Sequence, residues 1–501
     1  MFKDIAANFI GRFWSILSNF LFIPLYIKFL GFDSYSIISF SLVIAGLMAM
    51  LDAGLTATLS REFARLDVTV NEKINLFKTL ETSYFIICGL CTFSVLIFTS
   101  NIARSWLNLN TIEVEKVSFF LKIVIVDFGF QLIMRFYLGG LLGLQKQVTA
   151  NIYQVIWGVV RNGLVLIVIL ILPSLKLFFM WQAVSTVFFT ILIRFALMGS
   201  LTGYYKYYYR PTIDILVFKK VWRFTGGMLL ISLVACLNTQ MDKIVISKLL
   251  PIKSLGYYTL GITLSMGIIT IVNPISTALL PRFTALYSEK KNFEAANLYS
   301  KISLFVSILI FSIMSNMIVF SRELLWIWTG DKELSQMASV YLPIIAFAMG
   351  MLSLQIMAFN VCVANGYTKL NNLLGLLSLF VTIPGYWFAT RYFGAIGTAY
   401  VFCFVQSLTT LFYVYYVNKK FSIAQSLSSL YFNQMLFPLI LSLLVAFLFS
   451  FISNQIPNNR IITLFLIGLS TFFAAVISVL VLVDKNQKKN IYSFILNFKK
   501  K

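Results

Sequence analysis

Polar side chains recur at helical spacing inside long apolar segments of this 501-residue chain. Asp127, Gln131 and Arg135 follow one another at intervals of four residues, so they share one face of a helix. Comparable stripes hold Asn8, Arg12, Ser15 and Asn19; Asn151, Gln154 and Arg161; Gln182, Thr186, Thr190 and Arg194; Asn238 and Asp242, with Lys243 beside them; and Thr259, Thr263, Thr270, Asn273 and Thr277. The arginine fork binds phosphate, and hydroxyl and amide groups can bond sugar hydroxyls. Such stripes suit a cavity that receives phosphate and sugar.

Charges inside apolar segments are costly, so those present are expected to face a cavity. The candidates for cavity lining are Arg12, Asn19, Arg61, Asp127, Arg135, Arg161, Arg194, Asn238, Lys243, Asn273 and Arg282. Arg61 and Arg282 lie at segment ends, where simple anchoring at the membrane surface is the alternative. Asp127 could instead pair with Arg135, two turns away. Arg161 lies deeper, which favours cavity lining.

Asp52, Asp127 and Asp242 are the carboxylates that this interpretation places well inside apolar segments. If the cavity also binds a proton or a sodium ion, the binding site for that ion is expected among these three aspartates. Otherwise each is expected to be the partner in a salt bridge, and the adjacent Lys243 could be the partner of Asp242. Both alternatives remain open at the level of sequence.

Histidine is absent, which excludes a Ser-His-Asp triad, a His-ligated metal site and an imidazole proton relay. Cys88 and Cys91 have the spacing of a zinc or redox motif, but no second pair accompanies them. We therefore expect no catalytic residues, no metal and no cofactor.

The composition places these residues in a membrane. Hydrophobic residues make up 59% of the chain and charged residues 12%, about half of what soluble domains carry. Fourteen apolar runs are long enough for helices that cross a bilayer: about 8–30, 35–57, 79–100, 117–143, 149–172, 176–200, 222–249, 256–280, 299–320, 336–363, 370–391, 395–417, 432–452 and 461–483. The sequence predicts an all-α polytopic membrane protein.

The net charge of +22 would suggest nucleic acid in a soluble protein. Here the basic residues lie between apolar runs, so the bilayer surface is the expected partner and nucleic acid is not. Most of them fall on one side of the membrane when both termini are placed in the cytoplasm. The basic tail 484–501 is expected to lie along the inner leaflet.

An internal repeat organises the runs. Residues 30–61 align with 250–282 after one inserted residue, and Arg61 then falls on Arg282. Six spans per copy predict two six-helix bundles related by a pseudo-two-fold axis along the membrane normal. The predicted organisation is an N-terminal bundle (1–200), a cytoplasmic linker (201–221), a C-terminal bundle (222–417), two further helices (432–483) and the tail (484–501).

Several segments resemble Wzx-type polysaccharide flippases of the multidrug/oligosaccharidyl-lipid/polysaccharide exporter superfamily. They are LDAGLTATLSREFARL (51–66), GGLLGLQKQVTANIYQVIWGVVRNG (139–163), FTGGMLLISLVACLNTQMDKIVISKLLPIKSLGYYTL (224–260), VNPISTALLPRFTALY (272–287) and YFGAIGTAY (392–400). The resemblance extends over residues 5–417, and it implies a location in the bacterial inner membrane.

The resemblance implies a flippase for undecaprenyl-diphosphate-linked oligosaccharide repeat units, serving O-antigen or other surface polysaccharide biosynthesis. A polysaccharide polymerase and a chain-length regulator are the implied protein partners. A lipid II flippase, a cation-coupled drug exporter, a polysaccharide polymerase and a non-transporting scaffold are the alternatives. An anionic cargo leaving a negative interior could be driven by the membrane potential alone, or by an ion bound at one of the aspartates.

Overall fold

A computed structural model describes residues 20–52, 54–65, 67–109, 112–203, 212–421, 431–456 and 459–482. The side chains of residues 51, 215–228, 230 and 231 lie outside this description. Helices build the described chain, and its one isolated β-bridge joins Asn108 to Pro251. Eleven of its helices are long and apolar enough to cross a membrane. The predicted all-α polytopic class is confirmed, whereas the count of fourteen helices and the pseudo-two-fold axis stay predictions.

The chain divides into two compact units. Unit 1 comprises residues 1–259 and 375–398, and unit 2 comprises residues 260–374 and 399–501. Two long helices, α10 (Ile252–Ser288) and α15 (Lys369–Lys420), contribute to both units. The division into bundles, linker and tail stays a prediction.

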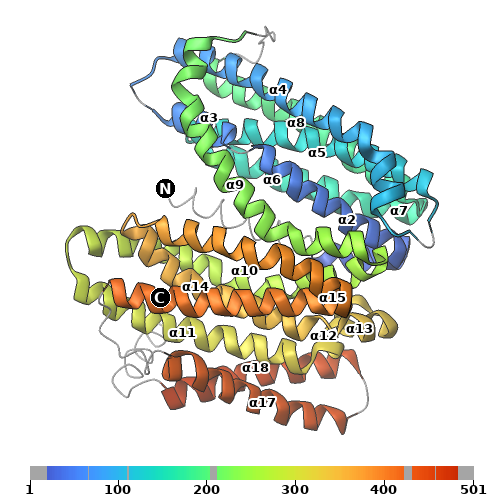
Figure 1. Ribbon diagram of the computed structural model, residues 1–501, viewed down its shortest axis with the longest axis vertical. Helices are drawn as coiled ribbons and strands as arrows, with labels where there is room; N and C mark the ends of the chain where they lie inside the picture. Colours follow the sequence, from blue (N-terminus) through green and yellow to red (C-terminus); the bar gives the residue numbers. More distant parts are fainter. Residues whose placement is uncertain are drawn as a thin grey trace. The chain divides into compact units, whose positions relative to one another are not determined.

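Unit 1 is built around α5. Its elements are the helix Phe20–Leu30, α2 (Phe32–Ala49), η1 (Met50–Asp52), α3 (Leu55–Ala64), α4 (Val70–Asn101), η2 (Ile102–Trp106), α5 (Val114–Gly143), α6 (Gln147–Gly158), η3 (Val159–Leu164), α7 (Val165–Ile171), α8 (Leu175–Thr202) and α9 (Ile215–Leu249). The helices α2, α3, α4 and α8 all pack against α5, and α4, α5 and α8 run side by side in Figure 1. Asp127 and Gln131 of α5 are thereby surrounded by protein.

Small residues let α3 approach α5 closely. A Cβ atom at Gly139 would overlap Cγ2 of Thr56, and one at Gly143 would lie 2.5 Å from the Ser60 carbonyl oxygen. Side chains larger than hydrogen therefore do not fit at these positions. The G-x-x-x-G spacing of Gly139 and Gly143 therefore serves packing within the chain.

Irregular backbone interrupts two predicted spans of unit 1. The span 35–57 breaks into α2, the single 3-10 turn η1 and α3, because Gly54 adopts a left-handed conformation with φ of 115°. The span 149–172 contains the π-helix η3, which includes Arg161. Wide turns of this kind are rare and occur frequently at functional sites. Both interruptions lie beside intramembrane charges.

Unit 2 is built around α11. Its further elements are the rest of α10, α11 (Asn292–Val319), α12 (Ser321–Thr329), α13 (Lys332–Ala338), α14 (Leu342–Ala364), the second part of α15, η4 (Phe432–Leu436), α17 (Phe437–Asn454) and α18 (Arg460–Leu482). The helices α14, α17 and α18 pack on α11, and α17 and α18 lie side by side (Figure 1). Small buried residues of the last two helices, such as Ser442, Ala446, Ser470 and Ala474, permit this packing.

The helix α15 contains two helices that meet at Gly394. This residue has φ of 67° and ψ of −160°, which is not helical. At the corner, a Cβ at Gly397 would overlap the Ala389 carbonyl oxygen, and the hydroxyls of Thr390 and Thr398 are 2.5 Å apart. The corner falls between the predicted spans 370–391 and 395–417.

Candidate functional site

Arg161 lies at the centre of a buried polar network in unit 1. Its guanidinium donates to Asp127 Oδ2 at 2.5 Å and to Gln182 Oε1 at 3.0 Å. Gln131 donates to the same Asp127 oxygen at 2.9 Å. The side chains of Arg161 and Asp127 are 13% and 4% exposed, so this ion pair is largely shielded from the surroundings. The network joins η3 to α5 and α8.

Aromatic residues hold the π-helix that carries Arg161. The Tyr26 hydroxyl donates to the Asn162 carbonyl at 2.6 Å, and the Trp181 indole donates to the Val160 carbonyl at 2.9 Å. The guanidinium carbon of Arg161 lies 5.4 Å from the centre of the Trp157 ring, within cation–π distance. Hydrogen bonds to the backbone and stacking on the indole ring thus fix the position of a single charge.

The Arg161 network leaves two buried polar atoms without a hydrogen bond. Within the part of the chain that the structure describes, Asp127 Oδ1 and Arg161 Nε have no partner. Buried polar groups are almost always bonded, so such atoms call for a partner that is not a protein atom. An anion could be received by the free edge of the guanidinium.

A second buried ion pair joins α4 to α8. Arg194 donates to both carboxylate oxygens of Glu81, at 2.7 and 3.3 Å, and the Tyr137 hydroxyl donates to Glu81 Oε1 at 2.7 Å. The Glu81 side chain is 1% exposed. Arg194, a predicted cavity residue, therefore has a structural partner that the sequence-based candidates did not include.

A third ion pair lies on α9. Lys243 Nζ is 3.1 Å from Asp242 Oδ1, and Lys243 also donates to the Thr239 carbonyl at 2.6 Å. The Tyr258 hydroxyl donates to Asp242 Oδ2 at 3.0 Å. These contacts connect α9 to the start of α10. Of the two alternatives that the sequence left open for Asp242, the structure has the salt bridge to Lys243.

Asn238 connects α9 to α15 within unit 1. Its amide donates to the Gly375 carbonyl at 3.0 Å, and its oxygen accepts from Ser378 at 2.7 Å. The amide hydrogen bonds of Asn238 are thus used within the protein.

The other intramembrane aspartate, Asp52, accepts hydrogen bonds from two hydroxyls. Thr56, one turn along the chain, donates to Oδ1, and Tyr84 of α4 donates to the same oxygen at 2.8 Å. Asp52 is half-buried, whereas Tyr84 is 1% exposed.

The remaining predicted residues are distributed differently. Arg61, Arg135, Asn273 and Arg282 are exposed on their helices. Because Asp127 bonds Arg161, the pairing of Asp127 with Arg135 that the sequence suggested does not form. Arg12 and Asn19 lie outside the described residues.

The predicted outer ends of unit 1 are held together by several contacts. Lys253 Nζ lies 2.9 Å from Asp33 Oδ1, and the rings of Phe32 and Tyr257 stack at 4.4 Å. The Trp106 indole of η2 donates to the Ser247 hydroxyl at 3.1 Å. The starts of α2 and α10 are thereby joined, as are η2 and the end of α9.

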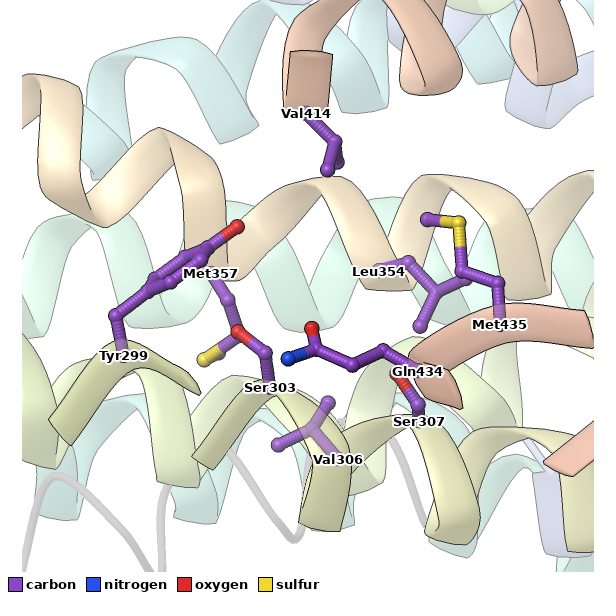
Figure 2. A pocket seen from close by; sticks show the side chains of 9 residues that line it. All are labelled: Tyr299, Ser303, Val306, Ser307, Leu354, Met357, Val414, Gln434 and Met435. Carbon is purple, nitrogen blue, oxygen red and sulfur yellow. The ribbon is translucent and has the colours of Figure 1, made fainter. Parts of the chain in front are cut away.

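Unit 2 contains a small buried cavity of about 20 Å³ (Figure 2). Its polar lining consists of Tyr299, Ser303, Ser307 and Gln434, and the Gln434 amide extends toward Ser303. This volume is enough for about one water molecule, so an oligosaccharide does not fit. The cavity therefore belongs to the packing of α11 against η4.

The model of the polysaccharide biosynthesis protein family matches residues 1–287, more than half of the chain. The chain belongs to this family. A second family model, MatE, matches residues 228–388. No curated protein matches the chain in sequence.

Solved structures share the fold of this family member. A lipid II flippase, MurJ, in an inward closed conformation has a TM-score of 0.72 at 14% identity, covering 97% of this chain and 100% of that chain. An inward-facing multidrug resistance MATE family transporter has a TM-score of 0.63 at 13% identity, covering 83% of this chain and 98% of that one. The MATE transporter VcmN of Vibrio cholerae, in its bent form, has a TM-score of 0.53 at 14% identity and covers 84% and 98%. At such identities the likeness concerns the fold.

Sequence reasoning overlooked Glu81 in this member of the polysaccharide biosynthesis protein family. Glu81 lies within the predicted span 79–100, so the sequence itself indicated an intramembrane charge there. The helix α4 begins at Val70 with a capping box between Thr69 and Glu72, which extends it beyond the predicted span. Glu81 therefore lies within a continuous helix and faces Tyr137 and Arg194.

Proposed function

We propose that this protein is a flippase that carries undecaprenyl-diphosphate-linked oligosaccharides from the cytoplasmic to the periplasmic face of the bacterial inner membrane. The observation that carries the proposal is family membership together with a fold that aligns over 97% of the chain with a lipid II flippase. The family description supports a role in polysaccharide biosynthesis, and the fold supports a carrier. O-antigen or another surface polysaccharide is the product of the pathway.

The Arg161 network supplies the chemistry that such a cargo needs. A diphosphate must pass through hydrocarbon without losing all of its polar partners. Arg161 presents a charge at a fixed position, and its Nε edge is unbonded among the described residues. Phosphate oxygens compete with Asp127 for the guanidinium, because both are anionic and bind the same donor groups. Gln131 and Gln182 can bond to sugar or phosphate as the ion pair opens.

Alternating access requires that the outer contacts of unit 1 break and re-form. The Lys253–Asp33 pair, the Phe32–Tyr257 stack and the Trp106–Ser247 bond join segments that belong to different copies of the predicted repeat. Each is only modestly stabilising at a partly exposed position. Together they form a closure that opens at low energetic cost.

A lipid II flippase is the second candidate, because the MurJ structure covers 97% of this chain. The MATE transporters cover 83–84%, so they leave part of the chain without a counterpart. A polymerase is disfavoured, because the solved structures that share this fold over most of its length are a flippase and transporters.

Deletion of the gene in its host tests the proposal. Lipid-linked oligosaccharide is then expected to accumulate on the cytoplasmic face and surface polysaccharide to disappear, and both changes are reversed by the wild-type gene. The lipid II candidate is tested by complementation of a strain depleted of its own lipid II flippase. Rescue of growth there, with surface polysaccharide unchanged in the deletion strain, would overturn the proposal in favour of lipid II.

A further inference from the structure

Two glutamine side chains join helices of unit 2 far from the helix ends. Gln355 lies on α14 and Gln406 on the second part of α15, each about 14 Å or more along the axis from either end of its helix. Gln406 Nε2 donates to Gln355 Oε1 and to the Thr410 hydroxyl, both at 3.1 Å. Thr410 in turn donates to the Met351 carbonyl at 3.1 Å. Gln355 and Gln406, here called the glutamine pair, therefore connect α14 to α15.

The glutamine pair uses only half of its hydrogen-bonding groups. An amide side chain has two N–H donors and one oxygen that can accept twice. Both donors of Gln406 and the oxygen of Gln355 are engaged between the helices. Among the residues that the structure describes, the amide nitrogen of Gln355 and the amide oxygen of Gln406 have no hydrogen-bond partner. The pair thus presents two donors and one acceptor oxygen to its surroundings.

Another amide of α14, Asn360, shows a purely structural arrangement. Its nitrogen donates to the carbonyl and hydroxyl oxygens of Ser276 at 3.1 and 2.9 Å, and its oxygen accepts from the same hydroxyl at 3.2 Å. Asn360 is 3% exposed, whereas Gln355 and Gln406 are half-buried. The unbonded groups of the glutamine pair can therefore be reached from outside the helix packing.

No charged residue accompanies the glutamine pair along its helices. The predicted spans 336–363 and 395–417, which contain the pair, hold no Asp, Glu, Lys or Arg. An unbonded amide in contact with hydrocarbon is costly, so polar side chains in the middle of membrane helices face a polar cavity or a polar partner. A neutral polar ligand therefore suits the pair better than lipid chains do.

The combination of donors and an acceptor narrows the chemistry of that ligand. A phosphate group offers only acceptor oxygens, and the Gln406 oxygen would repel it. A cation offers no acceptor for the N–H groups of Gln355. A sugar hydroxyl both donates and accepts, and an acetamido group has one N–H and one oxygen. The unbonded groups of the pair match a saccharide on both counts.

We propose that the glutamine pair binds the saccharide of the cargo, while the Arg161 network of unit 1 binds its diphosphate. The inference rests on the proposed function, because it assigns the saccharide contacts of the same carrier. A hydrogen bond between neutral groups changes affinity by about two- to tenfold. With both amides engaged, the pair favours a lipid that carries sugar over the same lipid without sugar by roughly tenfold.

Lipid binding by the full-length protein in nanodiscs tests the inference. The probes are the lipid-linked oligosaccharide extracted from the host and undecaprenyl diphosphate, which carries no sugar, and native mass spectrometry measures both dissociation constants. Gln355→Met/Gln406→Met removes both amides at similar side-chain volume, so neither is left without its partner and the fold is expected to persist. Affinity for the oligosaccharide lipid is expected to fall about tenfold, and affinity for undecaprenyl diphosphate is expected to stay unchanged. Gln355→Met alone, which removes the unbonded donors, is expected to lose about two- to tenfold for the oligosaccharide lipid only.

Gln434→Met is the matched control, because the same change removes a buried amide elsewhere in unit 2. Both affinities are expected to match the wild type in this control. A purely structural role of the glutamine pair would lower the thermal midpoint and change both affinities in parallel, and that result overturns the inference. Unchanged affinities in the glutamine double variant, or equal wild-type affinities for the two lipids, overturn it as well. Wild-type protein that binds neither lipid overturns the proposed function and the inference with it.

Discussion

Replacement of Arg161 by alanine separates a structural from a transport role. The change removes both hydrogen bonds of the guanidinium and leaves the Asp127 carboxylate, 4% exposed, without its cation. Removing one member of a buried ion pair costs about 3–5 kcal/mol, because the remaining charge is uncompensated. We therefore expect Arg161→Ala to lower the thermal midpoint of the purified protein and its amount in the membrane.

The double variant Arg161→Ala/Asp127→Asn removes the orphaned charge. A neutral amide at position 127 can still accept from Gln131, so most of the lost stability is expected to return, leaving a deficit of about 1–2 kcal/mol from the missing hydrogen bonds. Fluorescence-detected size-exclusion chromatography after heating measures this in crude detergent extracts. Asp127→Asn alone leaves the Arg161 charge without its counter-ion, so this single variant is expected to be less stable than the double variant.

Transport then decides the role of Arg161. If the guanidinium binds the diphosphate, the double variant is expected to be present at near wild-type level and yet to export less than about a tenth of the wild-type amount of surface polysaccharide. A tenfold loss corresponds to roughly 1.4 kcal/mol of missing binding energy. Arg161→Lys is expected to retain part of the activity, since a point charge replaces the fork. Full export by the double variant would refute the reasoning, and it would leave Arg161 as a purely structural residue.

Three further predictions concern topology, closure and packing. Reporters fused between residues 454 and 459 and at the C-terminus are expected to report periplasm and cytoplasm, respectively, and the reverse pattern contradicts the N-in, C-in topology. Cysteines at Asp33 and Lys253, joined by a short cleavable bifunctional thiol reagent, are expected to stop export until the linker is cleaved, because the charged ends of the native side chains lie 2.9 Å apart; export that continues while the link is intact contradicts a closure that must open. Gly143→Ala is expected to cost about 1–3 kcal/mol through overpacking against Ser60, and Gly89→Ala, which meets nothing within 4 Å, is the control. Equal thermal midpoints for the two glycine variants would contradict the tight contact.

Composition and hydrophobic run length were sufficient to predict the fold class. Apolar runs of about 20 residues have few structural alternatives in a bilayer, so an all-α membrane protein followed directly. The close contact at Gly139 and Gly143 also leaves a signal in the sequence, because two glycines four residues apart are typical of close helix packing. The break at Gly54 was not predicted, since its left-handed conformation depends on how α3 packs against α5.

The partners of the charged residues were harder to predict. Helical periodicity placed Asp127 on the same face as Arg135, yet Asp127 bonds Arg161, 34 residues away. Periodicity reports only which residues share a helix face, and contacts between helices depend on rotation and tilt that a single sequence does not record. Glu81 was overlooked although its charge lies in a predicted span, and its partner Arg194 lies 113 residues further along the chain.

The most direct test of the central claim is flipping by the purified protein. Proteoliposomes that contain an undecaprenyl-diphosphate-linked disaccharide are treated from outside with a membrane-impermeant sugar oxidant, which reacts only with molecules in the outer leaflet. With wild-type protein we expect all of the lipid-linked disaccharide to react with the oxidant within minutes. With the Arg161→Ala/Asp127→Asn variant we expect only the half that starts in the outer leaflet to react. If the oxidant reaches the same half of the lipid pool with wild-type protein as with empty liposomes, the assignment as a flippase for this class of lipid is contradicted.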